Sequence, residues 1–423
     1  MITRNITPTK AILICLNSMI GAGLFISVRP LTEIAGALGF VSYIIAALIL
    51  LPLILCIAEL ASLHPVAGGL YVYSNTYLGP WYGFLSGWGY FVGKTVSATV
   101  LMHKFVEFFY IRIPAMQYAP QLLIDAAMLF FIVGINSMGV SIGGRVQYVF
   151  TTLKAIPILF SIGASFYLFN PNNFKDIHDV TNILQTIPIA LFPLLGFEVI
   201  CAITNMIEDA RNTIKRIILS AFSIVAIINI CFLVASFGIL GQQFKSINEP
   251  VLAIGLRALG SYPLIAQLIN GAVFASIIGA CFSLLTSNCW NLHTIARHGQ
   301  LPGTSFLTKV NRFNVPWVSF LVEVIIGCLI LLITVEQIPL QNMAVFAQVI
   351  AYLLSSLAAW YAVRTGATKR IAWWLPLLAL AGCCVVLGIC LHRIIALGIS
   401  LPFLLILVAG VVLAVGKKFF RVS

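Results

Sequence analysis

Apolar residues occupy about twelve long windows along this chain, separated by short polar segments. Each window is close to or above the roughly 20 residues that an α-helix needs to cross a bilayer. Only 9% of the 423 residues are charged and 61% are hydrophobic, whereas soluble domains carry roughly a quarter charged residues. The pattern predicts an all-α polytopic membrane protein with twelve transmembrane helices. The predicted spans are 10–33, 41–63, 83–109, 122–140, 146–168, 183–207, 217–240, 264–295, 318–335, 344–363, 373–391 and 397–415.

Lysine and arginine are unevenly distributed between the two sides of these spans. With the N-terminus inside, the inner segments contain fifteen such residues and the outer segments five. Because inner loops are enriched in basic residues, we expect both termini to be cytoplasmic and the protein to lie in the cytoplasmic membrane. The net charge of +12 then reflects topology and does not indicate a nucleic-acid partner.

Helix-breaking residues interrupt the first and sixth windows. Gly21 and Gly23 stand in the first, and Pro188, Pro193 and Gly196 stand in the sixth. Broken backbone at membrane depth is tolerated only where protein covers it or where it lines a cavity. Either break alone is more often an ordinary kink. Together they occupy corresponding positions of two five-span repeats, which is typical of inverted-repeat transporters.

This reading divides the chain into three parts. Residues 1–170 form a first inverted repeat, 171–365 form a second, and 366–423 form two peripheral spans with a cytoplasmic tail. Five spans are an odd number, so the second repeat enters the membrane with the opposite orientation.

The ends of broken helices offer unpaired main-chain groups. N–H groups at the start of a half-helix suit a carboxylate, and carbonyl groups at the end of the preceding half suit an ammonium group. A site with both poles fits an α-amino acid. The predicted substrate-binding residues are Ser18, Met19, Ile20, Gly21, Ala22, Gly23, Leu24, Phe192, Leu195, Gly196 and Phe197.

Short motifs follow one another over the first three-quarters of the chain. They are Gly21-Ala22-Gly23-Leu24-Phe25, Ala58-Glu59-Leu60-Ala61, His64-Pro65-Val66-Ala67-Gly68-Gly69-Leu70-Tyr71, Gly87-Trp88, Gly196-Phe197-Glu198 and Arg297-His298-Gly299-Gln300-Leu301-Pro302. As an ordered set they resemble the amino acid–polyamine–organocation transporter superfamily. The resemblance implies a ten-helix inverted-repeat core with two peripheral helices. It also implies secondary transport of amino acids or related amines by alternating access.

Lys154 is a charged residue well inside the fifth window. A lysine at that depth is costly and is usually functional, although its ammonium can also snorkel to the interface. Sodium-independent family members resemble this arrangement, with a lysine in place of a sodium ion. The resemblance implies that Lys154 bridges the first break and hydroxyls of the eighth span. The candidate hydroxyls are Ser283, Thr286 and Ser287. Proton coupling and plain exchange both stay open.

Other side chains in the spans have candidate roles. Glu198 either ties the sixth span to a neighbour or carries protons, and Lys94 has Glu198 or Glu323 as a possible partner. In family members an aromatic residue at the position of Phe192 covers the substrate as a gate; the alternative is an ordinary core phenylalanine. Specificity is expected from Trp88, Tyr90, Asn288, Cys289, Tyr352 and Ser355.

Residues and spacings that the sequence lacks narrow the substrate class and count against an enzyme. No acidic residue stands near the first break, which favours a neutral or apolar amino acid over a polyamine or a cationic amino acid. The histidines are scattered without metal-binding or catalytic spacing, so we expect no enzyme, no metal and no cofactor. A non-transporting membrane sensor of amino acids is a further alternative. The expected partners are an amino acid or amine and the lipid bilayer, with neither a monomer nor a homodimer favoured.

Overall fold

The computed structural model describes residues 6–21, 23–66, 68–138, 140–175 and 182–420, with the side chains of 140–151, 245, 400 and 416–420 excepted. Within these residues the protein is helical, with one isolated β-bridge between Ile6 and Ile207. The α-helices are α1 (Pro8–Met19), α2 (Gly23–Ala35), α3 (Gly39–Leu63), α4 (Gly69–Leu78), α5 (Pro80–Arg112), α6 (Gln121–Asn136), α7 (Val140–Leu168), α8 (Ile183–Leu191), α9 (Ala210–Leu240), α10 (Pro250–Ala258), α11 (Pro263–Arg297), α12 (Thr304–Leu307), α13 (Trp317–Ile333), α14 (Gln337–Arg364), α15 (Trp374–Ala396) and α16 (Ser400–Phe420). The 3-10 helices are η1 (Gly36–Leu38), η2 (Pro114–Tyr118), η3 (Pro171–Phe174), η5 (Phe192–Leu194), η6 (Phe197–Met206) and η7 (Gly241–Ser246).

Six segments of the described chain are long and apolar enough to cross a membrane, judged by length and composition. They are Gly23–Leu63, Ile183–Met206, Ala210–Phe244, Pro263–Arg297, Gln337–Arg364 and Trp374–Ala396. Shorter apolar helices cover Gln121–Asn136, Thr152–Leu168, Trp317–Ile333 and Leu401–Val415. A chain with this many apolar helices is a polytopic membrane protein, as predicted. The count of twelve spans and the inverted repeat stay predictions.

Large apolar side chains also cover much of the outer surface. Leu48, Leu159, Leu268, Leu332 and Leu401 each expose between 63% and 68% of their area. Such a surface favours aggregation in water, whereas lipid tails are as apolar as leucine and accept it without loss. The outer faces of these helices are therefore suited to hydrocarbon.

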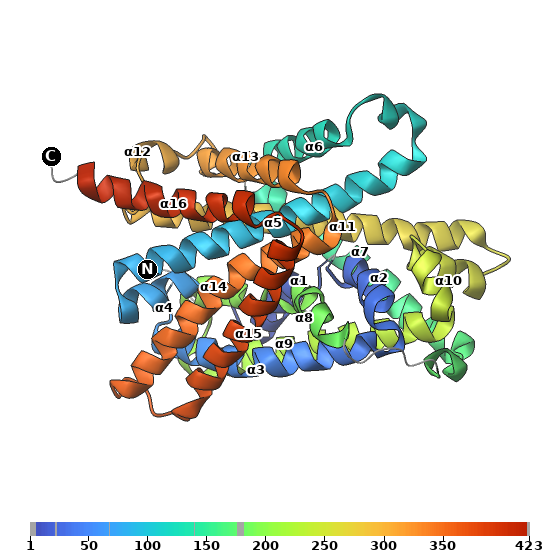
Figure 1. Cartoon of the computed structure of the whole chain (residues 1–423), viewed down its shortest axis with the longest axis horizontal. Helices are drawn as coiled ribbons and strands as arrows, with labels where there is room; N and C mark the ends of the chain where they lie inside the picture. Colours follow the sequence, from blue (N-terminus) through green and yellow to red (C-terminus); the bar gives the residue numbers. More distant parts are fainter. Residues whose placement is uncertain (1–5, 22, 67, 139, 176–181, 421–423) are drawn as a thin grey trace.

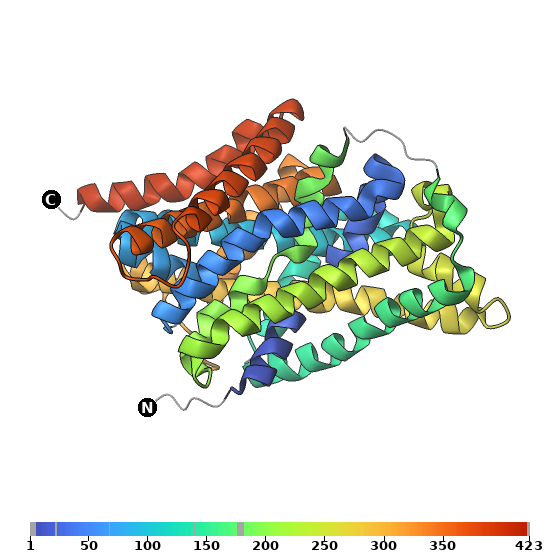
Figure 2. The same ribbon diagram turned by 90° about the horizontal axis from the view of Figure 1, so that it is seen from below.

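The centre of the bundle is α5, which packs against α4, α11, α13 and α14 (Figure 1). Around it, α1 packs against α9 and η6, and α2 packs against α8. The last two long helices, α15 and α16, lie along one side of the bundle (Figure 2). Both ends of the described chain lie at the same end of the long axis (Figures 1 and 2).

We call that end the basic end, because its loops and helix ends carry most of the basic side chains. They include Arg211, Lys215, Arg297, Lys309, Arg312, Arg364, Lys369 and Arg370. The other end of the bundle, here called the opposite end, contains the loops 113–120, 169–175 and 259–262 (Figure 1).

The structure differs from the predicted spans mainly at short helices and helix ends. The helices α4 and α10 are too short to cross a bilayer and did not produce an apolar window. The tenth span begins at Gln337 instead of residue 344. Its first turns carry two amides that bond to α2. The half-buried Gln337 donates through Nε2 to the carbonyl of Ile26 at 2.6 Å, and the buried Gln341 donates through Nε2 to Ser27 Oγ at 3.0 Å. Polar residues lower the hydropathy there, and only the tertiary structure provides their partners.

Candidate functional site

The first predicted span is interrupted at the expected glycines. Helix α1 ends at Met19, and α2 begins at Gly23. The chain turns out of the helix at Ile20, whose N–H donates to Leu16 O at 2.7 Å, and at Gly21, whose N–H donates to Met19 O at 2.8 Å. Ala22 lies outside the described residues. The described groups nearest the break are therefore the end of α1 and the first turn of α2.

The sixth span is interrupted as well. It consists of α8, the single turn η5 and the 3-10 helix η6, with an extended Leu195 between the last two. Gly196 has φ of +114°, a left-handed conformation that favours glycine. Its N–H donates to Glu198 Oε2 at 3.0 Å. The break is thus fixed by glycine and by a carboxylate two residues further on.

These two breaks lie against each other. A Cβ atom on Gly23 would be 3.1 Å from Pro193 Cα and 3.2 Å from Phe192 Cδ1. A Cβ atom on Gly196 would be 3.1 Å from the carbonyl oxygen of Ser18. At the basic end the same two segments are joined again, because Ile6 N–H donates to Met206 O at 3.2 Å. Two segments far apart in sequence therefore form one backbone crossing within the bundle.

Lys154, on α7, reaches the first half-helix. Its ammonium donates to the carbonyl oxygen of Asn17 at 2.7 Å and also to Asn17 Oδ1. Only 9% of the residue is exposed. Asn17 stands in the last turn of α1, where the helix dipole places partial negative charge. An ammonium in this position therefore stabilises the broken end of the helix.

The three candidate hydroxyls lie on α11, which packs against α7. Thr286 Oγ1 donates to Asn136 Oδ1 of α6 at 2.6 Å, and Ser287 Oγ donates to Leu284 O at 3.0 Å. Ser283 is half-buried on the same helix. Lys154 thus contacts α1 directly, whereas a bridge from Lys154 to these hydroxyls stays a prediction.

Glu198 forms a buried ion pair at the sixth-span break. Lys94 Nζ lies 2.8 Å from Glu198 Oε1, and both side chains are at most 5% exposed. The hydroxyl of Tyr90 donates to the same oxygen at 3.0 Å. Tyr90 and Lys94 are one turn apart on α5, so both reach Glu198 from one face. Of the two partners considered for Lys94, the structure selects Glu198.

A small pocket of about 70 Å³ approaches this carboxylate from the basic end. Its lining includes Tyr90 and Glu198, Gly69 and Tyr71 of α4, and Ser287 and Asn291 of α11.

The loop before α4 is held by a 2.8 Å hydrogen bond between His64 Nε2 and the hydroxyl of Tyr77. Partial burial lowers the pKa of His64, so the imidazole is neutral at pH 7. The loop is thus held by a bond between neutral groups.

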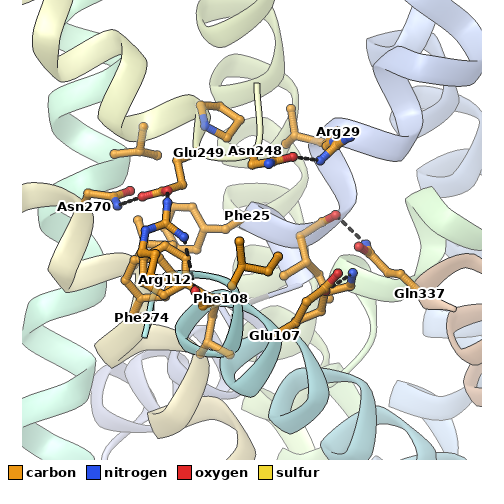
Figure 3. A pocket seen from close by; sticks show the side chains of 18 of the residues that line it. Phe25, Arg29, Glu107, Phe108, Arg112, Asn248, Glu249, Asn270, Phe274 and Gln337 are labelled. Carbon is orange, nitrogen blue, oxygen red and sulfur yellow. Dashed lines mark hydrogen bonds and ion pairs between the residues drawn. The ribbon is translucent and has the colours of Figure 1, made fainter. Parts of the chain in front are cut away.

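A larger cavity of about 390 Å³ approaches the crossing from the opposite end (Figure 3). Its apolar lining includes Phe25 and Ile26 in the first turn of α2, with Phe108 of α5 and Phe274 of α11. Its charged lining residues are Arg29, Lys104, Glu107, Arg112 and Glu249.

The charges of this cavity are paired. Arg29 bonds to Glu33 at 2.7 Å, Lys104 to Glu107, and Arg112 to Glu249. Asn270 Nδ2 donates to Glu249 Oε2 at 2.5 Å (Figure 3). The two cavities therefore lie on either side of the backbone crossing, and the larger one has a charged but internally neutralised lining.

Comparison with known proteins identifies the family. A family model described as amino acid permease matches residues 6–420. The chain belongs to the amino acid permease family. The predicted superfamily is thereby confirmed.

An uncharacterised transporter of Mycobacterium tuberculosis is 27% identical over 98% of this chain and 90% of its own length. The amino-acid permease RocE of Bacillus subtilis is 24% identical over 88% of this chain and 78% of its own. The aromatic amino acid transport protein AroP of Escherichia coli is 24% identical over 76% and 72%.

In this permease fold the predicted substrate-site residues are brought together, with Ala22 undescribed. Phe192 is 8% exposed and lies against Gly23. Phe197 is fully buried and stacks on Tyr352 with ring centroids 5.7 Å apart. The matching breaks in the first and sixth spans predict this proximity of the substrate-site residues. A role for Phe192 as a gate stays a prediction.

The predicted specificity residues are more dispersed in the permease. Tyr90 and Tyr352 lie close to η6, but Trp88 Nε1 donates to Leu407 O of α16 at 3.0 Å. Asn288, Cys289 and Ser355 are fully buried, with Asn288 bonded to Glu323 of α13 and Ser355 to Ala351 O of its own helix. Neither cavity is lined by these three residues or by Trp88. The periodicity of the sequence did not show that these four side chains face neighbouring helices and not a cavity.

We predict that Gly196→Ala abolishes transport by the permease. Alanine at this left-handed φ costs about 1–3 kcal/mol, and its methyl group would press on Ser18 O. The matched control is Gly134→Ala in α6, where a Cβ atom meets nothing within 4 Å. The measurement is uptake in proteoliposomes together with the unfolding temperature in detergent. Equal uptake by Gly196→Ala and Gly134→Ala would contradict the expectation that transport depends on the close approach of the two helix breaks.

We predict that Lys94→Met destabilises the permease by about 3–5 kcal/mol, because it leaves the Glu198 carboxylate buried without its partner. Lys94→Met combined with Glu198→Gln should recover part of this loss. The control Arg29→Met breaks a half-exposed pair and should cost only about 0–1 kcal/mol. Thermal unfolding in detergent measures all three. If the double variant is no more stable than Lys94→Met, the unpaired Glu198 carboxylate is not the cause of the lost stability.

Proposed function

We propose that the protein is a secondary transporter that moves amino acids across the cytoplasmic membrane by alternating access. The observation that carries this proposal is the glycine-mediated crossing of two broken helices, with one cavity on each side. Broken helices at matching positions of two repeats form the central site of inverted-repeat transporters. The printed names of RocE and AroP, which refer to amino acids, support the same substrate class.

In this proposal the main chain binds the part that all amino acids share. N–H groups in the first turn of α2, at Gly23 and Leu24 and at Ala22 before them, receive the carboxylate. Carbonyl groups at the end of α1 and at Leu195 and Gly196 receive the ammonium group. Phe192 covers the bound substrate.

The substrate's side chain is proposed to be neutral. Among the described residues, the carboxylate at the crossing is Glu198, and Lys94 already neutralises it. A second ammonium on a polyamine or a cationic amino acid would therefore have no unpaired carboxylate there.

Lys154 is proposed to replace a coupling sodium ion. Its contact with Asn17 at the end of α1 puts a fixed positive charge where a bound cation would otherwise stabilise the broken helix. Transport would then not require sodium. The alternative is that Lys154 loses and regains a proton during the cycle, in which case its charge is not fixed.

The proposed architecture is that of the sequence reading. Residues 1–170 and 171–365 form two inverted five-span repeats, and 366–423 form two peripheral spans. The basic end faces the cytoplasm, in accord with the positive-inside rule. Both ends of the described chain lie there (Figure 2).

Counterflow in proteoliposomes tests the function. A thermal-shift screen of the common amino acids and polyamines first selects a ligand, because a ligand that binds the native state raises its stability. Liposomes preloaded with that ligand should then take up the labelled form faster than empty ones. A ligand that shifts the melting temperature without accelerated uptake would indicate a sensor. No shift with any compound would contradict an amino acid site.

We predict that Lys154→Ala abolishes counterflow, because the end of α1 loses its cationic partner. Lys175→Ala is the matched control, since Lys175 lies exposed at the opposite end. Labelled counterflow is measured with sodium and with choline as the external cation, over a range of pH. Wild-type transport should be equal in the two salts. A Lys154→Ala protein with unchanged transport and pH dependence would remove the proposed role of this lysine.

A further inference from the structure

A buried carboxyl group on α13 takes no part in the site described above. Glu323 is 0% exposed. Its Oε1 accepts a hydrogen bond from Asn288 Nδ2 at 2.7 Å, and its Oε2 has no hydrogen-bond partner among the described residues. Within the same residues no basic side chain forms an ion pair with it. The ionisable groups facing it from α11 are the thiols of Cys281 and Cys289.

A carboxylate in this environment would be costly. An isolated charge buried in low dielectric loses several kcal/mol of hydration, and one neutral amide does not replace it. Of the other three buried carboxyl groups among the described residues, Glu198 has Lys94 and Asp125 has His103 within hydrogen-bond distance. The third, Glu59, lies at the end of α3 and accepts a hydrogen bond from the hydroxyl of Thr368. The protonated, neutral carboxyl group is therefore the form that this environment favours for Glu323.

Polar contacts connect Glu323 to the small pocket at the basic end. Asn291 lines that pocket, and its Nδ2 donates to Asn288 Oδ1 at 3.0 Å. Asn288 in turn donates to Glu323. Asn288 Nδ2 also lies 3.0 Å from Phe91 O and 3.1 Å from Thr95 Oγ1. Three acceptors compete for two N–H hydrogens, so a change at Glu323 changes how Asn288 is held.

Towards the opposite end, polar residues continue along α5. Thr95, Thr99 and His103 follow at intervals of four residues, on a different face from Tyr90 and Lys94. Thr99 Oγ1 would lie 2.7 Å from a Cβ atom on Gly327, one turn beyond Glu323 on α13. His103 Nδ1 lies 2.8 Å from Asp125 Oδ2, and both residues are buried. The next turn of α5 carries Lys104 and Glu107, which line the large cavity.

We propose that Glu323 is a proton-binding site that couples proton movement to transport, and that a column of polar side chains along α5 and α13 connects it to both cavities. The proposal rests on the transport function proposed above. Glu323 accepts one proton from water in one cavity as its carboxylate becomes a carboxylic acid. It returns that proton to water in the other cavity within the transport cycle. Asn288 and Asn291 lead to the small pocket, and His103 with Asp125 leads to the large cavity. Lys154 then stays a fixed cation.

The test measures proton movement and exchange separately. Wild-type protein is reconstituted into liposomes that contain a pH-sensitive dye, with the membrane potential clamped by potassium and valinomycin. Addition of the substrate selected by thermal shift should change the internal pH. Glu323→Gln should abolish this change and leave counterflow intact, because glutamine is a neutral substitute for the protonated acid and exchange needs no net proton transfer. The control Glu336→Gln, at an exposed position, should retain both.

Each outcome decides the question. No substrate-dependent pH change in the wild type, or an unchanged one in Glu323→Gln, overturns the proposal while counterflow still supports transport. Absent counterflow in the wild type overturns the transport function itself. If Glu323→Gln does not fold, Asp125→Asn takes its place: it should retain counterflow and slow the pH change, and an unchanged rate overturns the column.

Discussion

The structure depends on how two broken helices satisfy their main chain inside an apolar bundle. In hydrocarbon an unpaired N–H or C=O group costs several kcal/mol, so a break must be covered by protein or line a cavity. Here Gly23 and Gly196 let the breaks approach each other until backbone meets backbone. Side chains at either position would separate them. Around this contact lie the half-helices α1, α2 and α8, the segment η6 and both cavities.

Buried charges fix the breaks to the surrounding scaffold. Lys154 bonds α7 to the end of α1, and Lys94 with Tyr90 bonds α5 to Glu198 beside Gly196. Each break therefore has one contact with a lysine of a neighbouring helix: a charge-assisted hydrogen bond from Lys154 at the first break and an ion pair with Lys94 at the second. A buried ion pair gains little net energy but costs much when one partner is removed. The Lys94–Glu198 pair therefore sets the position of η6 against α5 more than it adds to overall stability. Any movement of a half-helix against α5 or α7 must rearrange one of these two contacts.

The proposed substrate site and the polar column through Glu323 lie on different faces of α5. Tyr90 and Lys94 face η6 beside the crossing and the small pocket, whereas Thr95, Thr99 and His103 face α6, α11 and α13. One central helix, α5, thus contributes to both. The polar column follows from individual residues of this chain, above all from Glu323, whose Oε2 has no hydrogen-bond partner among the described residues.

The sequence alone determined the membrane class, the family resemblance and the positions of both helix breaks, since apolar windows, glycines and prolines act locally along the chain. It also indicated that Lys154 and Glu198 lie within spans, because a charge in an apolar window is visible without a structure. Only the tertiary structure decided which groups meet: Lys94 with Glu198 and not Glu323, Asn288 with α13 and not a cavity, and Gln341 of α14 with Ser27. Such pairings join residues tens to hundreds of positions apart. They depend on the rotation and depth of each helix, which hydrophobic periodicity cannot define when a helix is apolar on every face.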